Sequence, residues 1–355
     1  MFLRLSFFAI FALFLFGCSA TITATNVVPP RAGEIKAKQV GVLEIKGDRN
    51  DYFTTTLSSV IDKLELGGEK RFQVYDRNQI ENIIKEQKFQ ATIGDPATMV
   101  KFGRLSGIEA GFFGGIDYNT GSRNYTEKRR RCEDKNTCYE YNVTCTDTDH
   151  ALRTTISLTD FSTAKVLYSN AFNKSRRVKT CSDSSYASSS STSGDEKGFL
   201  GILGTALSTE TEQEEVPEAV RHLKDSSDPY VKLVNVTLTE IARDLGEYYV
   251  TSTIEIEKTD KTLSETDKLK FESGVEFATS KRFDRACEIW KDLERSYPQA
   301  PNLVFNLGVC KESTADYEGA LSYYKKADSL ALEPNKMVNR ALTRINAKIE
   351  RANVK

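Results

Sequence analysis

Val40-Gly41-Val42-Leu43-Glu44-Ile45 is the stretch that decides the fold of the first part of the chain. In an extended chain, Val40 and Val42 point to one face, and Gly41, Leu43 and Ile45 point to the other. Both faces are therefore largely apolar, which is typical of a strand buried on two sides within a sheet. We expect this strand to lie inside an α+β domain.

The residues that follow alternate between helical and strand periodicity. Residues 51–66 carry apolar side chains at helical spacing, and 72–75 form a short apolar strand. Asp76 is the expected N-cap of a second helix, and Asp95-Pro96 opens a third. Residues 110–116 are apolar and rich in glycine, and they predict a third strand.

A hairpin, a helix and a last strand complete the expected domain. Residues 152–158 alternate apolar and polar side chains, and 166–172 return after a turn. A helix follows Pro229, and residues 248–256 alternate again, which indicates a last strand or an extended linker. These boundaries predict one α+β domain over 38–256.

The order of these residues resembles the curli-secretion-channel (CsgG/HfaB) family of outer-membrane lipoproteins. In that family a strand runs into a charged residue and an arginine at the head of a helix, followed by spaced acidic, glutamine and glycine positions. The resemblance implies a CsgG-like α/β sandwich, in which we interpret Arg77 as a fold-setting residue that pairs with a helix end. The matching residues are Val74-Tyr75-Asp76-Arg77, Glu86-Gln87, Gly94-Asp95, Gly103 and Gly107, and Gly114-Gly115.

Two insertions separate this chain from the pore-forming members, in which two inserted hairpins per subunit supply a membrane barrel. The first insertion, 119–149, contains Lys128-Arg129-Arg130-Arg131, and each basic residue at mid-membrane costs about 2–4 kcal/mol. A strand over 139–145 is expected within it. The second insertion, 173–215, is serine-rich, and its apolar stretch 198–204 predicts a disordered loop or a patch that touches membrane or partner. We expect inserted loops at both points.

Four cysteines lie in the two insertions, where no core requires them: Cys132, Cys138, Cys145 and Cys181. Four cysteines allow three disulfide pairings, and the sequence does not choose among them. Each bridge formed in an oxidising compartment contributes about 2–4 kcal/mol. A zinc site is the rival interpretation, but no Cys-x-x-Cys spacing occurs, so we expect no metal.

A 34-residue repeat occupies the C-terminal part of the chain. It resembles the tetratricopeptide repeat, in which small residues let paired helices approach and bulky residues fill the remaining space. We expect all-α repeats over 267–355, with 335–353 as a capping helix, after a linker at 257–266. The repeat-packing residues are Gly274, Ala286, Trp290 and Pro298 in the first copy, and Gly308, Ala320 and Tyr324 in the second.

Cys287 and Cys310 lie inside predicted repeat helices. We interpret them as buried thiols, and a bridge between the two helices is the alternative.

Leu15-Phe16-Gly17-Cys18 closes an apolar run that begins after Arg4. The run is too short to span a bilayer and predicts a secretory signal peptide over 1–17. Its end resembles the bacterial lipoprotein box, which implies lipidation of Cys18 and a lipidated tether over 18–37. The alternatives are a cleaved signal with a chance cysteine, or an uncleaved anchor. The resemblance to the curli-secretion-channel family implies an outer-membrane lipoprotein that faces the periplasm, and exposure at the cell surface stays open.

Composition narrows the function. The 49 basic and 50 acidic residues nearly cancel, so no global field attracts nucleic acid. Two histidines, no phosphate-binding glycine loop and no nucleophile elbow predict no catalytic site and no cofactor. We therefore expect a non-enzymatic scaffold or assembly factor that binds a protein or peptide through its repeats and the membrane through its lipid. A subunit of a ring-forming export channel is the alternative, and homo-oligomerisation stays open.

Overall fold

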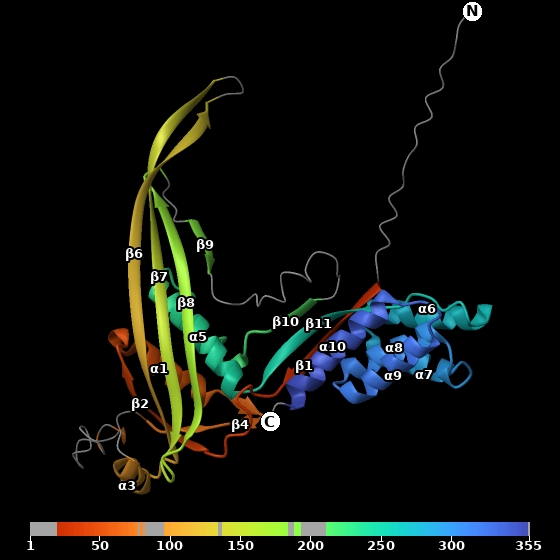
Figure 1. The fold of residues 1–355 in the computed structure, drawn as a ribbon, viewed down its shortest axis with the longest axis horizontal. Coiled ribbons are helices and arrows are strands. Elements are labelled where there is room, and N and C mark those ends of the chain that lie inside the picture. Colours follow the sequence, from red (N-terminus) through yellow and green to blue (C-terminus); the bar gives the residue numbers. More distant parts are fainter. Residues whose placement is uncertain are drawn as a thin grey trace, which may run out of the picture. The chain divides into compact units, whose positions relative to one another are not determined.

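The computed structural model describes residues 20–76, 79–80, 82, 96–133, 137–183, 188–192 and 211–353. Its class is α+β with a C-terminal helical region, which confirms the predicted fold class. The chain divides into two compact units (Figure 1). The sheet unit consists mainly of Val27–Leu207 and Gln213–Val250, and the helical unit contains Thr251–Arg351 together with the chain up to Asn26.

A six-stranded sheet with the order β5-β2-β6-β7-β8-β9 forms the sheet unit. Strand β2 pairs in parallel with β5 and β6, whereas the ladders from β6 to β9 are antiparallel. Val40, Val42, Leu43 and Ile45 are all buried, so the predicted strand is confirmed. The strands are β2 (Gln39–Lys46), β5 (Gln73–Val74), β6 (Ala110–Cys132), β7 (Cys138–Asp160), β8 (Val166–Cys181) and β9 (Ser188–Thr192).

Helices pack on both faces of the base of this sheet. On one face, α1 (Tyr52–Asp62) and α5 (Pro229–Leu245) share a core with β2, β6 and β7, because their apolar stripes meet the alternate strand residues. On the other face, α3 (Pro96–Ser106) places Phe102 against Phe161, with the two rings edge to face.

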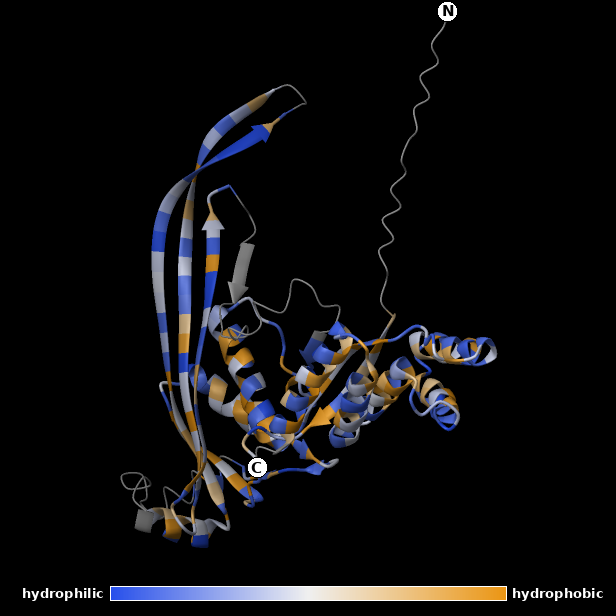
Figure 2. Cartoon of the chain, turned by 45° about the vertical axis from the view of Figure 1, so that its right-hand side comes forward, coloured by the Kyte–Doolittle hydropathy of each residue, from blue (hydrophilic) through white to orange (hydrophobic). Residues whose placement is uncertain are grey.

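Strands β6 and β7 continue far beyond the part of the sheet that β2 covers (Figure 1). Their residues pair without interruption from Ala110 opposite Asp160 to Cys132 opposite Cys138. The expected loop over 119–149 is therefore wrong, although the strand expected over 139–145 is present. The backbone ladder needs no apolar side chains, and Figure 2 shows mostly hydrophilic residues along this extension. Apart from the alternation over 139–145, the apolar periodicity read from the sequence is absent there.

The second insertion, 173–215, is also partly strand. Its start belongs to β8, and it contains β9 and β10 (Thr211–Glu214). The stretch 198–204, predicted as a loop, lies outside the described residues.

The helical unit combines helices with strand residues that come before and after the sheet unit in the chain. Strand β1 (Ala20–Val28) pairs with β11 (Tyr248–Ile256), which pairs with β10, and the unit boundary falls inside β11 instead of after residue 256. The helices are α6 (Glu265–Thr279), α7 (Phe283–Glu294), α8 (Pro301–Ser313), α9 (Tyr317–Leu330) and α10 (Lys336–Asn353). No helix in the described part of the chain is both long and apolar enough to cross a membrane.

The predicted tether, 18–37, is in part a strand. Alternate residues Ala20, Ile22, Ala24 and Asn26 of β1 are buried. Most of these side chains are small or polar, so their alternation did not register as apolar periodicity. The partner strand β11, more than 200 residues away, makes this segment a strand.

The predicted linker, 257–266, is packed structure. The backbone N–H and C=O of Glu257 bond the side-chain amide of Asn306. Asp260 is buried, and its Oδ2 accepts hydrogen bonds from the backbone N–H groups of Asn302 and Leu303 at the start of α8. The polar side chains therefore cap a helix, which apolar periodicity does not detect.

We predict that Gly114→Ala destabilises the sheet unit by about 1–3 kcal/mol, because overpacking of this order has that cost. A Cβ at Gly114 would lie 2.3 Å from the backbone oxygen of Thr155 on the neighbouring strand. Gly121→Ala on the same strand is the matched control, since its Cβ meets nothing within 4 Å. Urea unfolding measures both, and equal stabilities would contradict the prediction.

Candidate partner-binding surface

The helical unit is built from a contact that occurs twice. A Cβ at Gly274 of α6 would lie 2.5 Å from Nε1 of Trp290 on α7, and a Cβ at Gly308 of α8 would lie 2.6 Å from Cε1 of Tyr324 on α9. Only glycine lets the paired helices approach this closely. Of the remaining predicted packing residues, Ala286 and Ala320 are fully buried and Pro298 lies between α7 and α8.

Strands β1 and β11 cover one face of these helices; we call residues 20–26 and 251–256 the strand ribbon. Ile22, Ile254 and Ile256 belong to the same apolar core as the helices. Asn26 Nδ2 donates to the backbone oxygen of Glu312 at 3.4 Å, and Lys348 Nζ donates to Ser252 Oγ at 3.1 Å. The face formed by α8 and α10 is thus occupied by the chain's own strands and is not open to a partner.

A buried carboxylate fixes these elements together. Glu312 on α8 accepts hydrogen bonds from Arg344 Nε at 2.8 Å, Lys348 Nζ at 2.9 Å and the Tyr324 hydroxyl at 2.6 Å. Burial opposes its ionisation, but the hydrogen bond from Arg344 and the charges of Arg344 and Lys348 outweigh burial and lower the pKa of Glu312 to about 2. Burial and the Glu312 charge raise the pKa of Tyr324. The ion network therefore joins α8, α9 and α10.

A groove between α6 and α7 remains open; we call it the α6–α7 groove. It has a volume of about 630 Å³, and Leu269 on its edge is 68% exposed. Asp267 accepts hydrogen bonds from Lys270, Tyr297 and Ser264, and these bonds lower its pKa to about 2. The lining residues are Thr266, Asp267, Leu269, Lys270, Ser273, Ile289, Asp292, Leu293 and Ser296.

Sequence reasoning missed this groove. The repeat positions mark residues that the helix pair buries, and Leu269 lies two positions before the buried Phe271, on the opposite side of α6. The signal available in the sequence was Leu269 itself, because this apolar residue is out of phase with the buried stripe of α6.

All four cysteines of the insertions are in disulfides. Cys132 pairs with Cys138 and Cys145 with Cys181, each between directly opposite strand residues. A third bridge joins Cys287 of α7 to Cys310 of α8. The interpretation of this last pair as free buried thiols is therefore wrong, and the alternative bridge is present.

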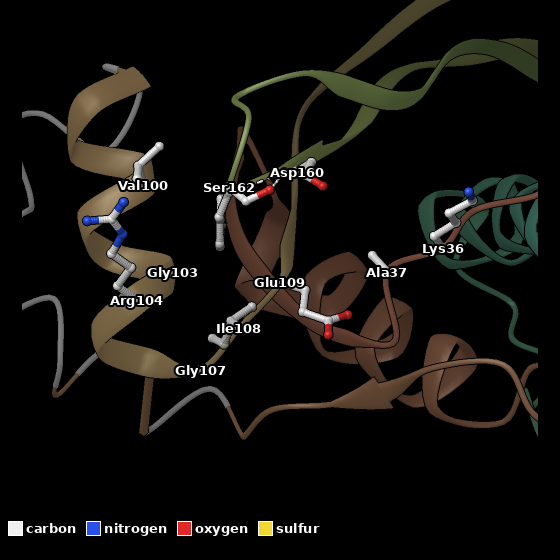
Figure 3. A pocket seen from close by; sticks show the side chains of 11 residues that line it. Lys36, Ala37, Val100, Gly103, Arg104, Gly107, Ile108, Glu109, Asp160 and Ser162 are labelled. Carbon is white, nitrogen blue, oxygen red and sulfur yellow. Dashed lines mark hydrogen bonds between the residues drawn. The ribbon is translucent and has the colours of Figure 1, made fainter.

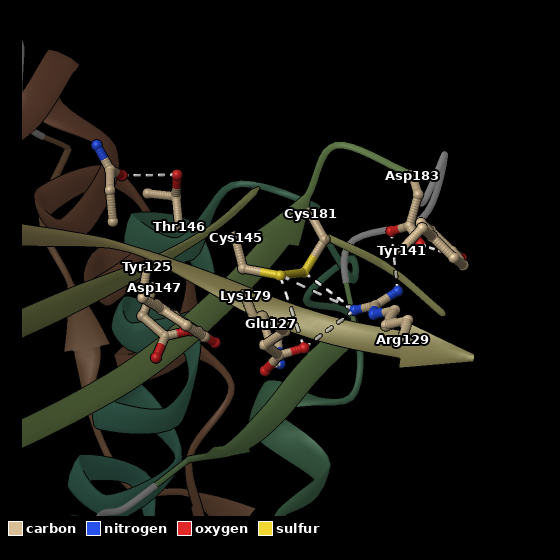
Figure 4. The surroundings of a disulfide bond; sticks show 11 residues. Tyr125, Glu127, Arg129, Tyr141, Cys145, Thr146, Asp147, Lys179, Cys181 and Asp183 are labelled. Carbon is tan, nitrogen blue, oxygen red and sulfur yellow. Dashed lines mark hydrogen bonds and ion pairs between the residues drawn. A yellow bond between two sulfur atoms is a disulfide. The ribbon is translucent and has the colours of Figure 1, made fainter. Parts of the chain in front are cut away.

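Charged side chains surround the Cys145–Cys181 bridge (Figure 4). Arg129 Nη2 lies 3.1 Å from Cys181 Sγ, and Nη1 of the same guanidinium donates to Asp183 at 2.9 Å. Glu127 pairs with Arg129 and Lys179 and lies close to both sulfur atoms. Because the sulfurs are bonded to each other, they offer no thiolate to a metal ion. We interpret these charged side chains as a polar cover over a disulfide with a structural role.

A second pocket of about 530 Å³ lies between α3 and the turn after β7 (Figure 3). Its two carboxylates are engaged by nearby backbone. Burial opposes ionisation of Asp160, but hydrogen bonds from Ser162 and Thr163 lower its pKa. Glu109 accepts from the backbone N–H groups of Lys38 and Gln39. We interpret these carboxylates as holding the turn and the strand ends.

Several predicted positions lie outside the described residues. These are the lipidation residue Cys18 and the resemblance positions Arg77, Glu86-Gln87 and Gly94-Asp95. Gly103 is described and packs against Phe161.

No family model matches this chain, and no curated protein matches it. Among solved structures, the chain is similar to the LpoB C-terminal domain from Salmonella enterica, with 13% identity and a TM-score of 0.24, over 40% of this chain and 85% of that one. It is also similar to lipoprotein GNA1162 from Neisseria meningitidis, with 18% identity and a TM-score of 0.23, over 47% of this chain and 92% of that one.

We predict that Glu312→Gln destabilises the chain by about 3–5 kcal/mol at neutral pH, because it removes the buried negative charge that Arg344 and Lys348 share. The folded pKa of about 2 lies below the ordinary value of 4.5. The carboxylate therefore stabilises the fold fully above pH 4.5, and this stabilisation is lost as pH falls towards 2. Urea unfolding from pH 7 to pH 2 should show the wild-type advantage shrinking. A difference that does not vary with pH would contradict this account.

We predict that removing the Cys145–Cys181 bridge costs more than removing Cys132–Cys138. The bridges span 36 and 6 residues, and loop-closure entropy gives about 4 and about 2 kcal/mol respectively. The two double alanine variants, with the remaining bridges intact, are compared by urea unfolding under oxidising conditions. A larger loss in the Cys132→Ala, Cys138→Ala variant would refute the ranking.

Proposed function

We propose that this protein is a lipid-anchored scaffold or assembly factor of the bacterial cell envelope, and that its helical unit binds a protein partner at the α6–α7 groove. The observation that carries the proposal is this groove. Leu269 on its edge is exposed, whereas the helical face formed by α8 and α10 is occupied by the strand ribbon. A surface of this kind suits docking of another polypeptide.

Two features support the location. The N-terminal sequence ends an apolar run at Cys18, as a lipidated secretory signal does. The three disulfides suit an oxidising compartment outside the cytoplasm. We assign no catalytic role, because the carboxylates of the described pockets are held by neighbouring backbone or by ion pairs.

The second candidate is a subunit of a ring-forming export channel. One observation favours it: the chain forms long paired strands at both insertion points, where the pore-forming members of the resembled family have hairpins. We rank it second because both faces of these strands carry charge, with Arg129 and Asp147 on one face and Lys128 and Glu140 on the other.

Native mass spectrometry of the full chain, extracted from membranes in mild detergent, tests the proposal. We expect an acylated chain with three disulfides that carries a different protein as partner, and we expect Cys18→Ala to lose the acyl mass and leave the membrane fraction. A closed homo-oligomer would favour the channel instead. An unacylated chain without a partner would refute the proposed function.

A further inference from the structure

We infer that the α6–α7 groove binds a basic amphipathic helix, with a large apolar side chain seated beside Leu269 and lysine or arginine on its flanks. The inference rests on the proposed function and specifies the chemistry of the partner.

The groove supplies an apolar floor. Leu269 comes from α6, and Ile289 and Leu293 come from α7. Single exposed leucines are common on protein surfaces. Here, however, the exposed Leu269 lines a concave site of about 630 Å³, a size within the range that holds a bound side-chain cluster. Of the described residues, only those of α6, α7 and the turn after α7 line the site.

When the side chains that form ion pairs are set aside, the charged side chains that remain beside this floor are acidic. Each cation near the groove has its own acid: Lys268 lies 2.7 Å from Glu265, Lys270 lies 2.8 Å from Asp267, and Arg295 lies 3.6 Å from Asp292. Glu272 and Glu276 are exposed, and neither forms an ion pair with a described residue. They follow Leu269 by three and seven positions, so all three side chains share one face of α6. Two exposed carboxylates therefore lie on the same face of α6 as Leu269, which lines the groove.

The shape favours a helix over an extended strand. The groove runs between two packed helices, and a third helix fits such a depression by ridges-into-grooves packing. Strands β1, β11 and β10 form a sheet of their own, and none of their described residues lines the groove, so no strand edge is offered there to an extended peptide. A helix presents apolar anchors at i, i+3 or i+4, and i+7, with charges to either side.

The test uses the full-length chain and three labelled synthetic 18-residue peptides. The first has leucines at helical spacing with lysines on the flanks, the second replaces lysine with glutamate, and the third scrambles the leucines of the first. Fluorescence anisotropy measures their binding. We expect the first peptide to bind, and its affinity to fall as salt rises. The glutamate and scrambled peptides should bind at least tenfold more weakly.

Variants locate the site. Leu269→Asp and the double variant Glu272→Lys, Glu276→Lys should each weaken binding of the lysine peptide at least tenfold. Leu332→Asp is the matched control for the leucine, because Leu332 is fully exposed in the same unit outside the groove. Glu318→Lys with Glu333→Lys is the control for charge. Thermal melting checks that all variants stay folded, as expected for exposed side chains.

If the lysine peptide binds equally to the wild type and to Leu269→Asp, the inference is overturned. It is also overturned if the control variants lose as much affinity for this peptide as the groove variants do. If the lysine peptide fails but a native partner is found whose binding survives Leu269→Asp, the scaffold function stands and the groove assignment falls. If the peptide binds as expected but the purified chain carries no partner, the proposed function falls and the groove chemistry stands.

Discussion

The backbone ladder of β6 is the constraint on which the sheet unit depends. This strand pairs in parallel with β2 inside the core, and it pairs along its whole length with β7. At its base, alternate residues such as Phe112 face α1 and α5, so hydrophobic burial fixes the register. The extension inherits that register and is held by backbone hydrogen bonds, two disulfides, cross-strand ion pairs and a small apolar cluster around Val143. One strand thus joins an apolar core to a polar hairpin.

The helical unit depends on a different constraint, the buried charge of Glu312. A carboxylate without contact with water is stable only when paired, and here two cations and a tyrosine hydroxyl surround it. Those partners lie on α9 and α10, while the backbone oxygen of the same residue accepts from Asn26 on β1. The network therefore holds the strand ribbon against the helices. Because the ribbon occupies the face formed by α8 and α10, the α6–α7 groove is the surface that we consider for a partner.

Apolar periodicity predicted the elements that bury side chains. The strand at 40–45, the strand over 248–256 and the helix after Pro229 all appear where their patterns indicate. Apolar periodicity failed to predict the segments that other interactions hold in place. Strand β1 buries small or polar residues, the segment around Asp260 caps a helix through a side chain, and the hairpin is held by its backbone. Apart from the short alternation over 139–145 in the hairpin, none of these leaves an apolar stripe in the sequence.

The sequence by itself determined the α+β class, the position of the C-terminal helices and the cysteines available for bridges, because these follow from local periodicity, spacing and residue type. Only the tertiary structure decided which cysteines pair, that β1 and β11 cover one helical face, and that Leu269 borders an open groove. Each of these depends on residues far apart in the chain coming into contact, and local patterns carry no information about such contacts.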